Sequence, residues 1–285
     1  MNPSSPTKFR RACELLAVTN TCEHIQKTIR YITRDSEVTM FFIDEPEGQS
    51  EESLRKYHQQ LSLLVDMITE GTDRDAFYSR LGKYLDEYGS LRTDLARIQL
   101  ANKLPASVFF KLHAATQTAP MKPARELVDE AADVIEKLDE QTGKKVVLVG
   151  GLYGAHEWEI ASMLEEAGLQ VAADLLCTSG RDITPRTSTE DMPVFDRLVL
   201  DYFNRLPCMP SLPNKRFYNH LENLFVNRDV KGMIYIRPAN CDSYDTEEER
   251  LHWSIDAPML TLGDEYDQLH NEKLMRTLRD FAANL

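Results

Sequence analysis

The 285-residue sequence contains no apolar run that approaches the roughly 20 residues that a membrane-spanning helix requires. Its first twelve residues, MNPSSPTKFRRA, also lack the apolar core of a secretory signal peptide. We therefore expect neither a membrane-spanning segment nor export. Apolar residues make up 42% and charged residues 28% of the chain, which are ordinary values for a folded protein and exclude a disordered one. The length favours two domains.

Basic residues are scarce beside acidic ones. The chain has 33 Lys and Arg against 46 Asp and Glu, which gives a formal net charge of -13. A surface of that sign repels phosphate backbones, so we expect no nucleic-acid partner. A local basic pocket for a small anion is compatible with this balance.

Cysteine is also scarce, and its spacing does not suggest a disulfide framework. The five cysteines are odd in number and far apart: Cys13, Cys22, Cys177, Cys208 and Cys241. Together with the missing export signal, this usage favours a reducing cytoplasm. The thiols are then expected to be buried, to bind a metal or to take part in redox chemistry.

Several catalytic signatures are missing. His156-Glu157 is not followed by the second histidine of a zinc-protease motif, and neither a Gly-x-Ser-x-Gly elbow nor a kinase motif set occurs. Gly150, Gly151 and Gly154 follow a predicted strand but match neither Gly-x-Gly-x-x-Gly nor a P-loop. We attribute these glycines to close packing, although their backbone N–H groups could also bind a substrate.

The first half of the sequence predicts a βαβ unit followed by helices. Residues 14–19 (ELLAVT) and 37–43 (EVTMFFI) have the pattern of short buried strands, and a helix is expected from Cys22 to Thr33 between them. Strands joined in this way are parallel. Residues 50–141 then show helical spacing of their apolar side chains almost throughout.

The second half alternates strands and helices. Strands are predicted at 145–149, 169–176, 232–236 and 259–262, with helices at 158–167, 193–204, 216–227, 246–255 and 272–285. This order predicts a small doubly wound parallel sheet.

Three cysteines come shortly after predicted strands, namely Cys22, Cys177 and Cys241. Ligands of open parallel sheets bind beyond the carboxyl ends of the strands, and thiolates are the ligands that iron–sulfur clusters require. The simpler alternative is that such a cysteine is a small buried apolar residue. We adopt that alternative for Cys177, and we expect Cys208 to be buried among its neighbouring prolines.

Several segments along the chain combine a predicted strand with characteristic residues directly after it. Residues 18–28 (VTNTCEHIQKT) form a strand, a turn with Asn20 and Cys22, and the start of a helix. Residues 145–181 place a strand and a glycine turn before a helix ending in Glu-x-x-Gly, and then a strand that ends in an acidic residue before Leu-Cys. Residues 232–245 (GMIYIRPANCDSYD) form a strand followed by a cysteine and an aromatic residue.

Residues 206–208 (LPC) and 260–266 (LTLGDEY) complete the pattern. In order and spacing, these segments together resemble the 2-hydroxyacyl-CoA dehydratase / benzoyl-CoA reductase subunit family, in particular its D-component-like subunits. The resemblance covers roughly residues 14–285. It implies an α/β fold with two Rossmann-like parallel-sheet domains joined by a helical segment. Residues 1–140 would form a partial α/β domain with the helical segment, and residues 141–285 the C-terminal α/β domain.

The resemblance also implies a [4Fe-4S] cluster on three cysteines between the two domains. By position, Cys22 corresponds to the second cluster cysteine of the family and Cys241 to the third. The family's first cysteine comes from a longer N-terminal region and has no counterpart at a matching position, because Cys13 is too close to the Cys22 strand. Water, a hydroxyl, Cys13 or another chain would then have to complete the cluster site.

The implied activity is that of a cytoplasmic lyase of anaerobic metabolism. Such an enzyme removes water from a 2-hydroxyacyl-CoA by ketyl-radical elimination, after an ATP-dependent iron–sulfur activator protein has injected one electron. The implied partners are an acyl-CoA substrate, a homologous second subunit and that activator. Arg181 and Arg186 are candidates for binding the phosphates of CoA.

Two alternatives stay open at this point. The chain could be a shortened paralogue without a cluster that acts as a structural or partner-binding subunit. It could also be a fragment whose missing N-terminal stretch holds the first cysteine. The shortened N-terminal region favours the first alternative over a complete enzyme subunit.

Overall fold

The computed structural model of the chain describes residues 15–19, 23–35, 38–151, 157–184, 186–238, 241–263 and 272–285. The chain packs as two compact units, each of which is discontinuous in sequence. Unit 1 combines the described parts of Met1–Gly82 with Thr187–Asn204 and Ser211–Pro213. Unit 2 combines the described parts of Lys83–Arg186, Arg205–Pro210 and Asn214–Leu285.

Unit 1 contains the predicted parallel βαβ element. Strands β1 (Leu15–Thr19) and β2 (Thr39–Ile43) pair in parallel, with Leu15 opposite Thr39, and helix α1 (Glu23–Thr33) connects them. This confirms the prediction of a parallel pair at this end of the chain.

Helices α2 (Glu51–Thr69) and α7 (Val194–Phe203) complete unit 1. The Ser50 hydroxyl caps α2 by accepting a hydrogen bond of 3.1 Å from the Ser53 backbone N–H. Apolar side chains one helical turn apart on α2 pack against α7, and this core comprises Tyr57, Leu61, Val199 and Phe203.

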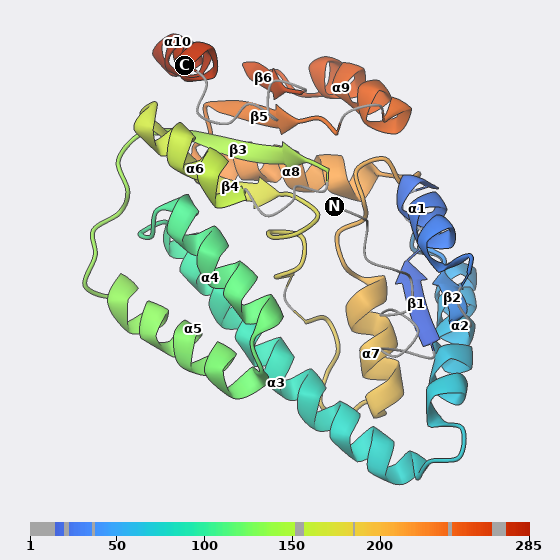
Figure 1. Cartoon of the computed structure of the whole chain (residues 1–285). Helices are drawn as coiled ribbons and strands as arrows, with labels where there is room; N and C mark the ends of the chain where they lie inside the picture. The colour runs from blue at the N-terminus through green and yellow to red at the C-terminus, as the bar shows by residue number, and fades with distance from the viewer. Residues whose placement is uncertain are drawn as a thin grey trace, which may run out of the picture. The chain divides into compact units, whose positions relative to one another are not determined.

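Unit 2 is built on a parallel sheet of four strands (Figure 1): β3 (Lys144–Gly150), β4 (Leu169–Leu175), β5 (Gly232–Ile236) and β6 (Met259–Leu262). Their order across the sheet is β4-β3-β5-β6, and every neighbouring pair is parallel. The predicted parallel sheet of the second half is therefore confirmed. The pairing of two Rossmann-like domains and the division at residues 1–140 and 141–285 stay predictions.

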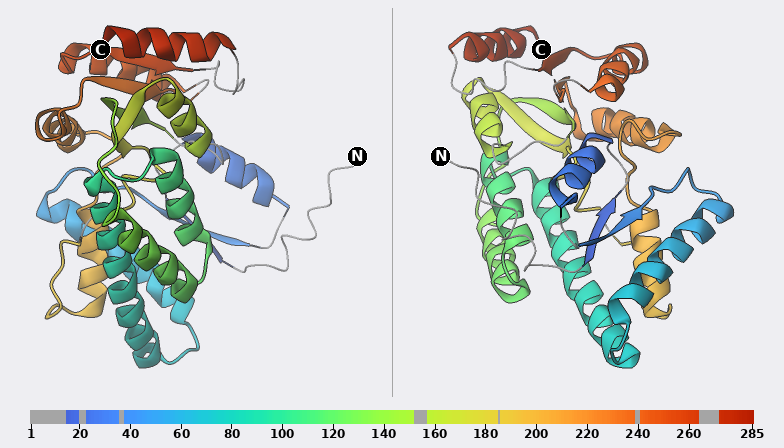
Figure 2. Two further views of the ribbon diagram at one scale, coloured as in Figure 1. Left: turned by 90° about the vertical axis from the view of Figure 1, so that its left-hand side faces the viewer. Right: turned by 45° about the vertical axis from the view of Figure 1, so that its right-hand side comes forward.

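Both faces of this sheet are buried, which explains why its strands are almost continuously apolar. Val146 and Leu148 of β3 face one core, whereas Val147 and Val149 face the other, as the two-residue period of a strand requires. Figure 2 shows α6 (Glu157–Glu166) and α8 (Lys215–Arg228) on opposite sides of the sheet.

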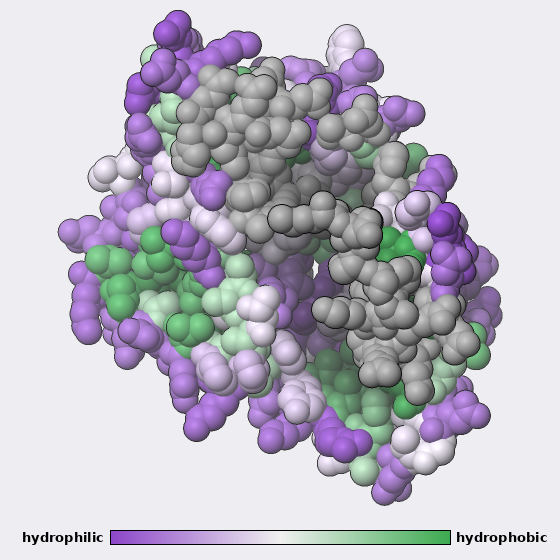
Figure 3. Space-filling view, in the orientation of Figure 1, coloured by the Kyte–Doolittle hydropathy of each residue, from purple (hydrophilic) through white to green (hydrophobic). Residues whose placement is uncertain are grey.

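The remaining helices of unit 2 extend these two cores. The first core takes in α4 (Ala106–Thr118), α5 (Met121–Ile135), α10 (Glu272–Asn284) and part of α3 (Arg74–Ala101). The second takes in α9 (Asp242–Ser254). The surface of α5 also carries apolar side chains, since Leu127 and Val134 are exposed there. Figure 3 shows hydrophobic residues gathered on part of the molecular surface.

Helix α9 begins earlier than the sequence predicts. The expected start was Thr246, because the acidic run that follows it suits the first turn of a helix. In the structure the helix begins at Asp242, and the backbone N–H groups of Tyr244 and Asp245 donate to the Cys241 carbonyl at 2.9 and 3.0 Å. This difference places Tyr244 in the first turn, close to the end of β5.

None of the described helices is long and apolar enough to cross a membrane.

Candidate functional site

The candidate site lies at the carboxyl edge of the sheet in unit 2. The chain leaves β3 for β4 on one side and later adds β5 on the other side, so the strand order reverses next to β3. Ligands of doubly wound sheets bind at such a reversal point. The ends of β3 and β5 are in close backbone contact here, because a Cβ atom on Gly150 would lie 2.2 Å from the Ile236 carbonyl oxygen. Close packing therefore accounts for this glycine, as predicted.

Cys177 follows β4 at this edge and is partly exposed. Its sulfur lies 4.0 Å from the Gly150 carbonyl oxygen and 3.7 Å from the Tyr244 hydroxyl. The Arg181 guanidinium donates to the same sulfur, with Nη1 at 3.1 Å. Polar groups from three different segments thus surround this thiol.

Cys208 also lies beside the Tyr244 hydroxyl. It is buried, as the sequence predicts, and its sulfur is 3.9 Å from that hydroxyl oxygen. One tyrosine hydroxyl therefore contacts both sulfurs.

The Cys177 thiol and the Tyr244 hydroxyl both differ in acidity from their ordinary values. The hydrogen bond from Cys208, the Arg181 charge and the Tyr244 hydroxyl outweigh burial and lower the pKa of Cys177 to about 6. Burial, together with the neighbouring sulfurs of Cys177 and Cys208, raises the pKa of Tyr244. Near neutral pH the Cys177 sulfur is therefore largely a thiolate and Tyr244 remains a hydrogen-bond donor.

Tyr244 is held in place through its backbone. The hydroxyl of Tyr235, a fully buried residue of β5, donates a hydrogen bond of 2.7 Å to the Tyr244 carbonyl oxygen. The sheet thus fixes the first turn of α9, and through it the tyrosine that contacts the two cysteines.

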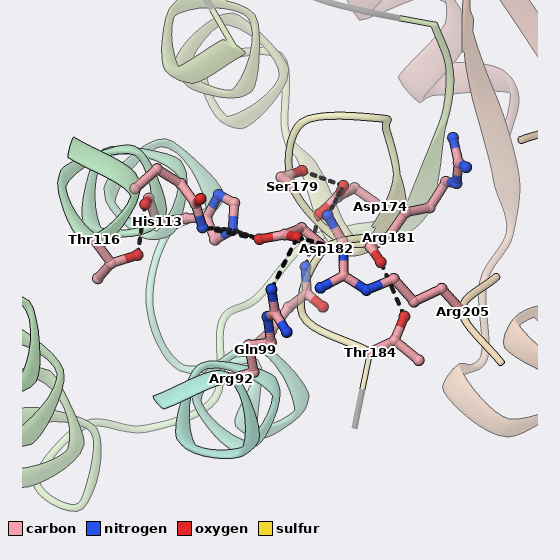
Figure 4. A network of polar contacts seen from close by, with 12 residues as sticks. Arg92, Gln99, His113, Thr116, Asp174, Ser179, Arg181, Asp182, Thr184 and Arg205 are labelled. Atoms are coloured by element: carbon pink, nitrogen blue, oxygen red, sulfur yellow. Dashed lines mark hydrogen bonds and ion pairs between the residues drawn. The ribbon is translucent and has the colours of Figure 1, made fainter. Parts of the chain in front are cut away.

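Asp174, near the end of β4, organises the loop that carries Cys177 and is itself fully buried (Figure 4). Its Oδ1 accepts from the Gly180 and Leu176 backbone N–H groups at 2.7 and 3.2 Å and from the Ser179 hydroxyl. Its Oδ2 accepts from Gln99 Nε2 of α3 at 2.7 Å. These hydrogen bonds satisfy both oxygens of the buried Asp174 carboxyl, whose pKa is raised by burial.

The loop needs glycine at position 180. A Cβ atom there would lie only 2.0 Å from the Asp174 carbonyl oxygen. With glycine, the loop closes tightly on Asp174, and the Arg181 guanidinium lies beside the Cys177 sulfur.

A second network, around Asp182, ties this loop to the segment that carries Cys208 (Figure 4). Arg205 Nη1 lies 3.0 Å from Asp182 Oδ1, and His113 Nε2 and Arg92 Nη2 lie 3.6 and 3.8 Å from the carboxylate. Burial alone would raise the pKa of Asp182, but His113, Arg205 and Arg92 hold it well below its usual range. Arg181 Nη2 adds a tie to the Leu206 carbonyl oxygen at 3.3 Å.

The two arginines predicted as candidates for CoA phosphates both have protein partners. Arg181 binds the Cys177 sulfur and the Leu206 carbonyl, and Arg186 Nη1 forms an ion pair with Asp86 Oδ1 at 3.1 Å. Both side chains are therefore engaged in holding unit 2 together.

Of the two predicted cluster ligands, Cys22 and Cys241, the structure describes only Cys241. Cys22 lies outside the described residues, as does Cys13. Cys241 is described: it directly precedes α9 beyond the end of β5, is partly exposed and packs against the second core. Its position and thiol chemistry suit one iron ligand at this edge. The pairing of Cys22 with Cys241 stays a prediction.

Among the described residues, no group of three or more His, Cys, Asp or Glu side chains is arranged to hold a metal ion. Cys177, Cys208 and Cys241 therefore do not form a metal site of their own.

Sequence reasoning missed the association of Cys177, Cys208 and Tyr244. Cys177 was predicted to be a structural residue, and Tyr244 was predicted to precede its helix. The only local signal is the four-residue spacing of Cys177 and Arg181, which places a cation beside a thiol when the loop forms a helical turn. The contacts to Cys208 and Tyr244 depend on which loops meet, and residue spacing does not reveal this.

Comparison with known proteins gives a clear family assignment. No curated protein matches the sequence significantly. The family model described as 2-hydroxyglutaryl-CoA dehydratase, D-component, matches residues 4–282, almost the entire chain. The chain therefore belongs to the 2-hydroxyglutaryl-CoA dehydratase D-component family.

Proposed function

We propose that this chain is the iron–sulfur subunit of a 2-hydroxyacyl-CoA dehydratase and that Cys22 and Cys241 are ligands of a [4Fe-4S] cluster. The observation that carries the proposal is the family match over residues 4–282. The place of Cys241 supports it, because its thiol lies just beyond the carboxyl end of a parallel strand, where ligands of such sheets bind.

A bound cluster would supply one-electron chemistry at the thioester carbonyl of a 2-hydroxyacyl-CoA, for the ketyl-radical elimination of water. The protein's own contribution would be to bind and orient the substrate at this edge. The Tyr244 hydroxyl, a donor whose pKa is raised by burial, and the partly exposed Cys177 thiol are polar groups present there.

The proposed partners are a homologous second subunit and an ATP-dependent iron–sulfur activator protein. A subunit contact through the helical part of the chain is supported by the partly exposed apolar side chains of α5, because such side chains on a surface are typical of interaction sites.

The proposal is tested by purifying the chain under strict anaerobiosis together with a similar neighbouring subunit. We expect a brown protein with about four irons per chain, acid-labile sulfide and a sulfur-to-iron charge-transfer band. Adding the activator protein, ATP and a 2-hydroxyacyl-CoA should then yield the unsaturated acyl-CoA.

A cluster-free subunit with a structural or partner-binding role is the second candidate. It is supported by the exposed apolar side chains Leu127 and Val134 of α5, which are compatible with a surface that binds a second subunit. A colourless, iron-free protein that still binds the second subunit under the same conditions would support this candidate and contradict the first.

A further inference from the structure

Two thiols outside the proposed cluster ligands are brought together in unit 2. Cys177 and Cys208 lie 31 positions apart in the sequence, yet both sulfurs lie beside the same Tyr244 hydroxyl, at 3.7 and 3.9 Å. Neither cysteine forms a disulfide in the structure. Two thiols that the fold holds at one hydroxyl are candidates for thiol–disulfide exchange.

The contact is built into the fold. Asp182 holds Arg205, and Arg181 holds the Leu206 carbonyl, so the segment entering Cys208 is tied at two successive residues to the loop of Cys177. Asp174 closes that loop from within through Leu176, Ser179 and Gly180. The pair therefore does not depend on a chance approach of two mobile side chains.

We propose that Cys177 and Cys208 form a redox-active dithiol that exchanges with low-molecular-weight disulfides such as glutathione disulfide and closes into an intramolecular disulfide. The inference concerns residues that the proposed function does not use.

The two thiols have different roles in this exchange. The Cys177 sulfur is partly exposed and lies beside the Arg181 guanidinium, so it is the attacking thiolate. It attacks one sulfur of glutathione disulfide, forming a Cys177–glutathione disulfide and releasing one glutathione thiolate, which takes up a proton. The pKa of Cys177, lowered to about 6, supports this role at neutral pH.

Cys208 completes the exchange. It is buried and shares the Tyr244 hydroxyl with Cys177, and in the proposed exchange it attacks the Cys177 sulfur of the mixed disulfide. The Cys208 proton leaves with the second glutathione, and a Cys177–Cys208 disulfide forms. In total, the two protein thiols lose two electrons and two protons, and one glutathione disulfide becomes two glutathiones.

The experiment uses the full chain, purified under anaerobic reducing conditions and then equilibrated in buffers of varied glutathione to glutathione disulfide ratio. Samples are quenched with acid, alkylated and digested with trypsin without reduction. Cleavage places Cys177 in residues 146–181, Cys208 in residues 206–215 and Cys241 in residues 232–250, because Pro238 blocks cleavage after Arg237. Each possible pair of these cysteines therefore gives a different linked mass.

We expect a disulfide bond that links the peptide of residues 146–181 to the peptide of residues 206–215. The mass of the linked species should be two hydrogens below the sum of the two reduced peptides. The reduced fractions of Cys177 and Cys208 should fall together with one common midpoint as the buffer becomes more oxidising. A link to residues 232–250, separate midpoints for the two cysteines, a stable glutathione adduct on Cys177 of the wild-type chain, or no modification would each overturn the proposal.

A Cys208→Ser variant gives an independent check, since it removes the second thiol and leaves the first. We expect Cys177 to remain as a glutathione adduct in this variant, at a level at least several-fold above the wild-type chain. The linked peptides are measured in the chain alone, without iron, substrate or partner. Failure of this proposal is therefore distinguishable from failure of the proposed dehydratase function.

Discussion

Arg181 donates a hydrogen bond of 3.1 Å from Nη1 to the sulfur of Cys177, four residues earlier in the chain. The same guanidinium binds the Leu206 carbonyl oxygen, two residues before Cys208. One side chain thus stabilises a thiolate and fixes the segment of a second thiol. Its position follows from the tight loop that Asp174 closes after β4.

The first prediction concerns the acidity of Cys177. The pKa of this thiol is lowered to about 6 by the Cys208 hydrogen bond first and by the Arg181 charge among other contacts, so Arg181→Gln should move it toward the ordinary value of about 8.5. The alkylation rate of Cys177 by iodoacetamide should level off above about pH 7 in the wild-type chain and continue to rise above about pH 8 in the variant. Peptide mass spectrometry measures both profiles.

Arg181→Lys is the matched control, because it keeps the positive charge at the same position. Its profile should lie nearer to that of the wild-type chain. Identical profiles for the wild-type chain and Arg181→Gln would show that the arginine does not stabilise the thiolate.

The second prediction concerns the loop that presents Cys177. In Gly180→Ala the new Cβ atom would lie 2.0 Å from the Asp174 carbonyl oxygen, so the loop must shift. We expect a loss of about 1–3 kcal/mol in the free energy of unfolding, measured with urea, as for other overpacked sites. In Gly82→Ala of helix α3 the Cβ atom would lie 3.3 Å from Val194 Cγ2, a much smaller conflict that the helix preference of alanine offsets, so the value should change by less than about 1 kcal/mol. Equal values for both variants would contradict this account of the loop.

The third prediction concerns Asp182 and follows from its pKa, which His113, Arg205 and Arg92 hold well below the usual range although burial alone would raise it. A carboxyl with a lowered pKa stabilises the fold above about pH 4, and this contribution declines as the pH falls further. Asp182→Asn should therefore lower the free energy of unfolding by about 1–3 kcal/mol at pH 7.

The difference between Asp182→Asn and the wild-type chain should become smaller below about pH 4, where urea unfolding can be repeated. Asp139→Asn, at an exposed position, should have little effect at either pH. A loss for Asp182→Asn that stays the same at both pH values would argue against an ionic role for this carboxylate.

Much of the fold could be predicted from residue patterns. The apolar runs of β3 and β5 indicate strands buried on both faces, and Val146 to Val149 alternate between two cores as such strands require. The parallel pairing of β1 and β2 likewise follows from the βαβ pattern. Helix boundaries were less well predicted, as at Asp242, where two acidic segments in succession could each form a first turn.

The thiol site could not be predicted to the same extent. Cys177 and Tyr244 are 67 positions apart, and the strand order that brings their loops to one edge is a property of the sheet. Periodicity identifies strands and helices but not which of their connecting loops meet. Cys241, in contrast, was singled out by its place after a strand, and the structure does place it beyond the end of β5.

The central claim, a cluster on Cys22 and Cys241, is tested most directly by the iron content of single Cys→Ser variants purified anaerobically with the second subunit. We expect Cys22→Ser and Cys241→Ser each to lose most of their iron and acid-labile sulfide relative to the wild-type chain, whereas Cys208→Ser keeps the wild-type amounts. Equal iron in all three variants and in the wild-type chain would contradict the assignment.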